Sequence, residues 1–209
     1  MENFKLIAFT VPDFFIGEEK IISELFARNL EILHLRKPNF SIQNLSAIIE
    51  KIPNEFHSRI VIHNNFELSK DFDLQGIHLT EQQKNNFQNL EHTYKIVSTS
   101  CHSLDDIATN QNFYEYLFLS PIFDSISKQN HNSKFSTDEL LAAKNKQIIT
   151  KKIIALGGIE LNNIKSIFDF GFGGVGVLGT LWNKFNSLDA ILNKFTLLKN
   201  EIKNVEKEK

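Results

Sequence analysis

Four of the seven histidines in this 209-residue chain stand at or just beyond the ends of short apolar runs: His34, His63, His78 and His102. An imidazole near neutral pH can both accept and donate a proton, which suits it to acid–base catalysis. We take His34, His78 and His102 as candidate catalytic residues. For any single one, the alternative is a structural hydrogen bond to a neighbouring backbone group. The other three histidines lie in polar surroundings and are expected at the surface: His57, His92 and His131.

Glycines follow the last two apolar runs of the chain. Gly157 and Gly158 come after the run 153–156, and Gly179 comes after the run 174–178. A residue without a Cβ lets a ligand approach the backbone closely, and the exposed N–H groups can then bind a phosphate. A single glycine pair could be a turn, but glycines after both runs favour a phosphate site.

Further polar side chains near these run ends complete the candidate binding set: Arg36, Asn64, Ser100, Ser125, Ser127 and Lys128. Ser125, Ser127 and Lys128 supply two hydroxyls and a cation that suit a second anionic group, the alternative being a solvent-exposed polar loop. The histidines show neither an HxxxH pattern nor a carboxylate at metal-ligand spacing. The sequence therefore predicts no metal site among them.

These residues need a scaffold, and the chain predicts eight strands alternating with amphipathic helices. The apolar runs span residues 6–9, 32–35, 60–63, 76–79, 96–99, 116–119, 153–156 and 174–178. Their near-continuous hydrophobicity is typical of strands in a parallel sheet, and Ser41, Ser103 and Ser136 are placed to cap intervening helices. This order and length predict one (β/α)₈ TIM barrel over residues 1–209, with strands and loops to about residue 182. A closing helix and a polar tail, which we expect to fray after Asn200, make up the remainder.

Composition narrows the class of protein. The formal net charge is −2 with only three arginines, so no nucleic-acid footprint is expected, and no window approaches the apolar length of a membrane span. The single cysteine, Cys101, argues for a reducing compartment, and we expect a cytoplasmic protein that acts on a small phosphate-bearing molecule. Apolar residues around 170–172, expected to be exposed, allow a homodimer.

Taken together, five blocks in this order resemble the thiamine phosphate synthase and TenI-type thiazole tautomerase superfamily. They read LHLR (33–36), GIHL (76–79), SCHS (100–103), SPIFDSISK (120–128) and ALGGI (155–159). The resemblance covers almost the whole chain, from residue 6 to about residue 182. It implies a (β/α)₈ barrel that binds a thiazole phosphate, with the phosphate on the loops after the last two strands.

The synthase branch of the superfamily implies Mg²⁺ on a leaving pyrophosphate, displaced from a pyrimidine by the thiazole nitrogen. Its members hold the ion with an aspartate after the third strand and another after the fourth. This chain has His-Asn-Asn at 63–65 and Thr-Glu-Gln-Gln at 80–83 instead. The usual Gln-x-Arg-x-Lys after the second strand becomes His-Leu-Arg-Lys-Pro at 34–38. Amides bind Mg²⁺ less well than carboxylates do, so the leaving-group half of the site is predicted to be weakened.

The tautomerase branch lacks these aspartates and needs only a proton shuttle, for which it usually carries a histidine after the sixth strand. Here that position is Pro121, so His34 or His102 would act instead. Our first hypothesis is therefore a thiazole isomerase without pyrophosphate chemistry. The second is a thiamine phosphate synthase with an altered metal site, using Mg²⁺, and the third is a non-catalytic barrel that binds thiamin phosphate.

Overall fold

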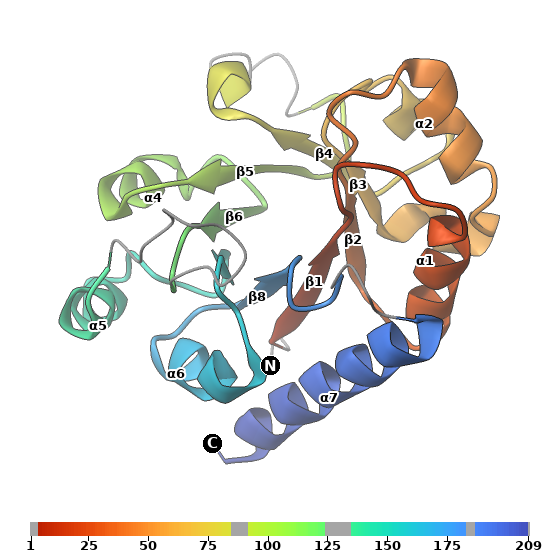
Figure 1. Ribbon diagram of the computed structural model, residues 1–209. Helices are drawn as coiled ribbons and strands as arrows, with labels where there is room; N and C mark the ends of the chain where they lie inside the picture. The colour runs from red at the N-terminus through yellow and green to blue at the C-terminus, as the bar shows by residue number, and fades with distance from the viewer. Residues whose placement is uncertain (1–3, 85–91, 124–134, 183–186, 209) are drawn as a thin grey trace.

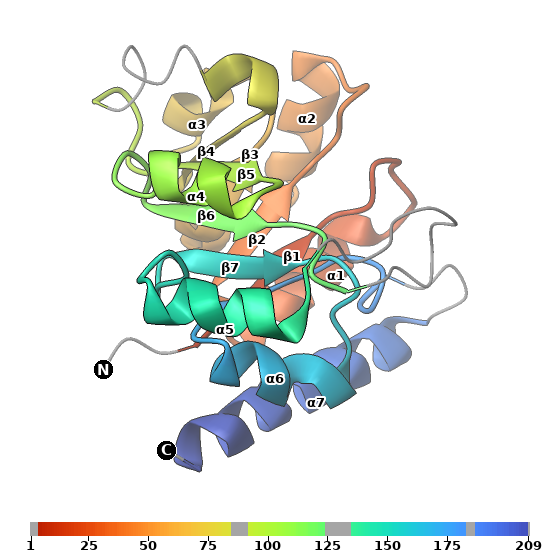
Figure 2. The same ribbon diagram turned by 90° about the vertical axis from the view of Figure 1, so that its left-hand side faces the viewer.

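Eight parallel strands close into a barrel in chain order, enclosed by helices (Figures 1 and 2). The computed structural model describes residues 4–84, 92–123, 135–182 and 187–208. The strands are β1 (Lys5–Phe9), β2 (Ile32–Leu35), β3 (Ile60–Ile62), β4 (Gly76–Leu79), β5 (Val97–Cys101), β6 (Tyr116–Leu119), β7 (Ile153–Leu156) and β8 (Gly174–Val177). All eight predicted runs are strands, with ends shifted by at most two residues. The predicted (β/α)₈ barrel is confirmed.

The helices between and after the strands are α1 (Glu18–Ala27), α2 (Ile42–Ile49), α3 (Leu68–Asp71), α4 (Leu104–Asn110), α5 (Thr137–Asn145), α6 (Ile164–Asp169) and α7 (Leu188–Lys207). The 3₁₀ segments η1 (Asn54–Arg59) and η3 (Leu161–Asn163) precede β3 and α6, and residues 81–84 are also 3₁₀. The three predicted serine caps are confirmed, because each hydroxyl accepts a hydrogen bond from the backbone three residues on. Ser136 and Glu139 form a complete capping box. None of the helices in the described segments has the length and hydropathy to cross a membrane.

Alternation along the strands divides the buried residues into two sets. One set points outward and packs under the helices, and the other fills the barrel interior with residues such as Ile7, Val61 and Phe118. The lower level of the interior, toward the amino ends of the strands, is apolar. At the upper level, toward the carboxyl ends, polar side chains enter from β2, β4 and β5: His34, His78 and Ser98. The polar level lies toward the carboxyl ends of the strands, where catalytic residues of such barrels stand.

The last helix differs from the expectation of a fraying tail. It continues to Lys207, and Ile202 and Val205 are buried in its second half. The Glu206 carboxylate accepts a hydrogen bond of 2.7 Å from the backbone N–H of Phe4, which joins the two ends of the chain. The helix runs past α1 and α6 (Figure 1). The apolar face of α7 therefore packs against α1 and α6, and this burial keeps the helix formed to Lys207 although most residues of the tail are polar.

Two further expectations about exposure are wrong. Phe170 and Phe172 are buried in the core rather than exposed, so they offer no surface for a dimer. His57 is also buried, since its Nε2 lies 3.1 Å from the Ile49 carbonyl oxygen and 2.9 Å from that of Ile52. A hydrogen-bonded histidine can be buried at little cost, which composition alone does not reveal. His92 is exposed as predicted, and His131 lies outside the described residues.

Candidate functional site at the carboxyl ends of the strands

The predicted site residues that the structure describes lie at one end of the barrel. Arg36 directly follows β2, Asn64 stands two residues after β3, Ser100 is within β5, and His102 follows it. Gly157 and Gly158 follow β7, and Gly179 follows β8. Ser125, Ser127 and Lys128 lie outside the described residues. The (β/α)₈ topology thus gathers at one end side chains that are far apart in the sequence.

Three histidines from three consecutive strand ends meet inside the barrel, and we call His34, His63 and His78 the interior histidine cluster. The Nδ1 atom of His34 lies 3.0 Å from the Nε2 atom of His63. The rings of His63 and His78 have centroids 4.4 Å apart, and those of His34 and His78 are 5.2 Å apart. One ring nitrogen from each histidine lies within 4.8 Å of the other two.

Partners around the cluster fix the rings. Nε2 of His34 is 2.7 Å from the Tyr116 hydroxyl, and the two nitrogens of His78 are 2.9 Å and 3.1 Å from the hydroxyls of Ser98 and Ser100. Burial lowers the pKa of all three histidines below 6.5, to about 3 for His78. Repulsion from other histidines of the cluster lowers the pKa of His34 and His63 further, and repulsion from Arg36 and Lys84 lowers that of His78. At neutral pH the cluster is therefore uncharged.

His102 is placed differently, at the exposed mouth of the barrel. Its Nδ1 atom lies 2.9 Å from the backbone carbonyl oxygen of Ser120. A carbonyl oxygen can only accept a hydrogen bond, so Nδ1 carries the proton and the Nε2 lone pair is left to accept another. This tautomer makes His102 a ready proton acceptor, whereas the buried histidines are poor bases.

The glycine loop after β7 has the backbone shape that a phosphate cradle needs. Gly157 and Gly158 have φ values of 91° and 64°, in the left-handed region that favours glycine. A Cβ on Gly157 would come within 2.9 Å of Pro121. Within the described parts of the chain, the backbone N–H groups of Gly158 and Gly179 donate to no other group. Both are available to a bound anion.

Lys37, one position earlier than the lysine of the family motif, does not reach the mouth. Its side chain and that of Glu18 on α1 are both 0% exposed, and the ammonium lies 2.7 Å and 2.8 Å from the two carboxylate oxygens. The same ammonium donates to the carbonyl oxygens of Val11 and Asp13 in the loop after β1. Lys37 therefore ties a mouth loop to the scaffold.

The positions that hold Mg²⁺ in synthases do not fit that ion here. Asn64 and Asn65 present amides, and the Oδ1 atom of Asn64 is buried without a hydrogen-bond partner among the described residues. Gln83 accepts hydrogen bonds from the backbone N–H and the hydroxyl of Thr80. The only carboxylate of the second segment, Glu81, is exposed and paired with Lys84 at 2.7 Å. Because Mg²⁺ is held by carboxylates and water, this donor set is unsuited to it.

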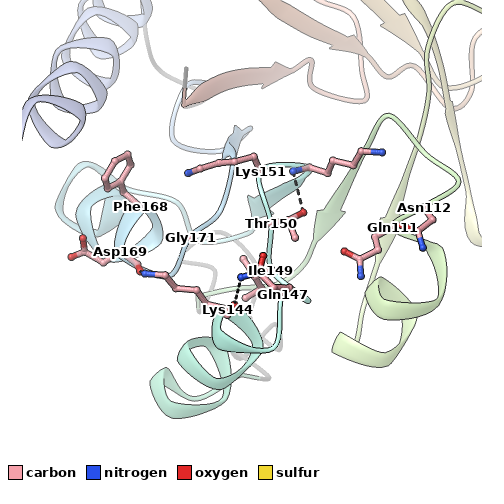
Figure 3. Close-up of a pocket in the computed structure, with 11 residues that line it drawn as sticks. Gln111, Asn112, Lys144, Gln147, Ile149, Thr150, Lys151, Phe168, Asp169 and Gly171 are labelled. Carbon is pink, nitrogen blue, oxygen red and sulfur yellow. Dashed lines mark hydrogen bonds between the residues drawn. The ribbon is translucent and has the colours of Figure 1, made fainter. Parts of the chain in front are cut away.

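A large cavity lies at the opposite end of the barrel, away from these residues. It has a volume of about 830 Å³ and is formed by the segments that lead into β6, β7 and β8 (Figure 3). Its lysines are already engaged: Lys144 donates to the Asp169 carbonyl oxygen and Lys151 to that of Phe172. In barrels of this type that end serves stability rather than catalysis. We therefore place the functional site at the histidine-bearing end.

Comparison with known proteins decides the family. Residues 14–181 match the family model described as thiamine monophosphate synthase. The chain belongs to this family. A thiamine-phosphate synthase from Clostridium tetani is 23% identical over 172 residues, covering 79% of this chain and 81% of that protein.

Two solved structures resemble this family member. The thiamine phosphate pyrophosphorylase from Bacteroides thetaiotaomicron is 40% identical with a TM-score of 0.85, covering 96% of this chain and 98% of the other. The thiamine phosphate pyrophosphorylase from Pyrococcus furiosus has a TM-score of 0.77 at 15% identity and covers 98% of both chains. The first likeness extends to sequence, whereas the second shows the shared fold alone.

Sequence reasoning singled out His34 and His78 in this family member but did not place His63 or Tyr116 with them. The available signal was strand alternation. His34 and Arg36 lie on the same face of their strand, and alternate residues of each neighbouring strand must lie on that face as well. Missing was the register: β2 pairs His34 with Val61, and β3 pairs Val61 with Gly76. Because His63 and His78 each stand two residues beyond one of these paired positions, both pairings are needed to bring the three histidines together.

Proposed function

We propose that the protein is a thiamin-biosynthesis enzyme that binds a thiazole phosphate at the barrel mouth and moves a proton on the thiazole. The observation that carries this proposal is the loss of carboxylates where synthases hold Mg²⁺. Asn64 and Asn65 replace one, Gln83 is engaged with Thr80, and Glu81 is exposed and paired with a lysine. A proton shift releases no pyrophosphate, so it does not depend on that ion.

The substrate phosphate is assigned to the glycine loops after β7 and β8. The backbone N–H groups of Gly158 and Gly179, which donate to no other group among the described residues, can donate to phosphate oxygens. Arg36 and Ser100 stand across the mouth after β2 and within β5. We assign these two residues, with Asn64, to the rest of the substrate.

The proton transfer is assigned to His102 rather than to His34 or His78. Its Nε2 atom would accept a proton from one ring atom of the thiazole while Nδ1–H stays hydrogen bonded to the Ser120 carbonyl oxygen. The imidazolium would then return that proton to a second ring atom, so that only the proton and the double bonds change place. His34 and His78 are buried, and their lowered pKa values make them weak bases.

The second candidate is thiamine phosphate synthase, in which the thiazole nitrogen displaces pyrophosphate from a pyrimidine. One observation favours it: the relatives at 23% and 40% identity carry synthase or pyrophosphorylase names. If this candidate holds, Mg²⁺ must be held mainly by substrate oxygens, because the described segments after β3 and β4 supply so few carboxylates.

Incubation of the purified protein with the thiazole phosphate tautomer, with and without Mg²⁺, tests the proposal. We expect isomerisation at an equal rate in EDTA. His102→Asn should lower kcat by about 10²- to 10⁴-fold while the substrate still binds, whereas His92→Asn, at an exposed histidine, should leave kcat unchanged. Thiamine phosphate formed at ordinary enzymatic turnover from both synthase substrates would establish the second candidate. Tight binding without turnover in either assay would leave a non-catalytic binding barrel.

A further inference from the structure

The interior histidine cluster puts three polar rings where apolar side chains would fill the barrel equally well. TIM-barrel interiors are normally packed with branched apolar side chains, and this one is so at its lower level. Its upper level instead holds three imidazoles from β2, β4 and the residue after β3. One nitrogen of each lies within 4.8 Å of the other two.

That spacing is close to the spacing of ligands around a transition metal ion. Zinc–imidazole bonds of about 2.0–2.1 Å place two nitrogens of a tetrahedral site about 3.3 Å apart. The Nδ1 atom of His34 and the Nε2 atom of His63 are already 3.0 Å apart, with the two rings at 73° to each other. Ring rotations that bring the third nitrogen closer by up to about 1.5 Å would complete the triangle.

We propose that His34, His63 and His78 bind one divalent transition metal ion, with Zn²⁺ as the reference ion. Imidazole nitrogens suit zinc, cobalt, nickel and copper, whereas Mg²⁺ and Ca²⁺ prefer oxygen ligands. The site is therefore distinct in chemistry from the magnesium site of synthases. It uses no carboxylate of the chain.

The partners of the histidines support ligation. If Nδ1 of His34 binds the metal, its Nε2–H can donate to the Tyr116 hydroxyl at 2.7 Å. If one nitrogen of His78 binds, the other keeps a serine hydroxyl, at 2.9 Å for Ser98 or 3.1 Å for Ser100. Hydrogen bonds of this kind orient metal-ligating histidines and fix their tautomers.

Of the three histidines, His63 alone is partly exposed. Phe9 packs on His34 and Phe118 on both His34 and His78, while His63 is only half-buried toward the mouth. Three histidines with a fourth position open to solvent are the arrangement of catalytic zinc rather than structural zinc. Neutral ligands leave the full charge of the ion, so the fourth ligand should be an anion such as hydroxide or a substrate carboxylate.

The charge of Arg36 also shapes the bound state. Arg36 directly follows β2 and is exposed, two residues beyond His34 on the same face of the strand. A cation near the site disfavours a second cation, which makes an anionic fourth ligand part of the proposal. Acetate or azide should therefore increase the affinity for the metal.

Metal titration of untagged, EDTA-dialysed protein tests the proposal without any substrate, so its outcome is independent of the proposed function. Calorimetry with Zn²⁺ should give one ion per chain. Co²⁺ should develop the visible d–d bands of a tetrahedral nitrogen site, which Zn²⁺ removes. His63→Asn should weaken Zn²⁺ binding by at least about a hundredfold, and His92→Asn, at an exposed histidine, should leave it unchanged.

A variant outside the metal ligands guards against loss of folding. Tyr116→Phe removes the partner of His34 but keeps three imidazoles, so it should weaken Zn²⁺ binding by about tenfold to a hundredfold with the Co²⁺ bands retained. If the cluster is only a hydrogen-bonded interior layer, the folded wild-type chain will bind no more Zn²⁺ than His63→Asn and Co²⁺ will show no tetrahedral bands. Either result overturns the proposal.

Discussion

Replacing Lys37 by methionine should lower the free energy of unfolding by about 3–5 kcal/mol, because it leaves the Glu18 carboxylate buried without its counter-ion. Both side chains are 0% exposed. The Lys37 ammonium contacts both carboxylate oxygens of Glu18 and donates to the carbonyl oxygens of Val11 and Asp13, and methionine would make none of these contacts. A loss of that size is a large part of the roughly 5–15 kcal/mol that holds a domain together.

The pair also has a pH signature. Burial raises the pKa of Glu18 and lowers that of Lys37, since desolvation outweighs their attraction. Without Lys37 the carboxyl pKa rises further. A raised carboxyl pKa contributes stability below the ordinary value of 4.5 that is lost as pH rises through the folded-state value. The difference in the free energy of unfolding between Lys37→Met and wild type should therefore shrink as the pH falls below the folded-state pKa of Glu18.

Urea unfolding at several pH values measures these effects, with Lys20→Met on the exposed face of α1 as the matched control. The double variant Glu18→Leu with Lys37→Met should recover most of the loss, because no buried charge remains. Its affinity for thiazole phosphate should stay within about threefold of wild type. A Lys37→Met protein that unfolds within about 1 kcal/mol of wild type but binds substrate tenfold more weakly would refute the structural role.

Three further outcomes follow from other parts of the fold. Gly157→Ala combines a strained φ with a clash, so it should lower stability by about 2–4 kcal/mol and weaken phosphate binding. Gly17→Ala also has a strained φ, of 90°, but its added Cβ would stand in open space, so it should lower stability by only about 1–2 kcal/mol. Thermal unfolding measures both losses. Burial raises the pKa of Cys101 to about 12, so its alkylation at pH 9 should be more than about a hundredfold slower in the folded than in the unfolded protein; equal rates would place the thiol in solvent. Deleting residues 201–209 removes two buried side chains and a hydrogen bond, and should cost about 4 kcal/mol in urea unfolding, whereas deleting only residues 208–209 should cost less than about 0.5 kcal/mol.

Much of the scaffold is legible in the sequence because each local signal agrees with the global fold. The strands are buried on both faces, so they read as continuous apolar runs, and each capping serine stands directly before its helix. The tail was misjudged because its charged letters hide a spacing of buried residues at Phe195, Leu198, Ile202 and Val205, which is the helical period.

The site was predictable in part. The topology alone places His34, His78, His102 and the glycine loops at one end of the barrel. Which histidines point inward depends on strand register, and their protonation depends on burial, neither of which spacing encodes. The position of Lys37 could not be predicted either, because it lies two residues beyond the end of β2, where strand alternation no longer fixes the direction of a side chain.

The joining of the chain ends has a consequence for how the protein is made. β1 pairs with β8, and the backbone of Phe4 is held by Glu206. On the ribosome, the outer edge of the first strand must wait for the last quarter of the chain before it can pair, and an unpaired edge is a template for aggregation. A circular permutant that links the adjacent ends and opens the chain before α5 would place β8 and β1 close together in synthesis, and would transfer the waiting edge to β7, whose partner β6 would then be made last.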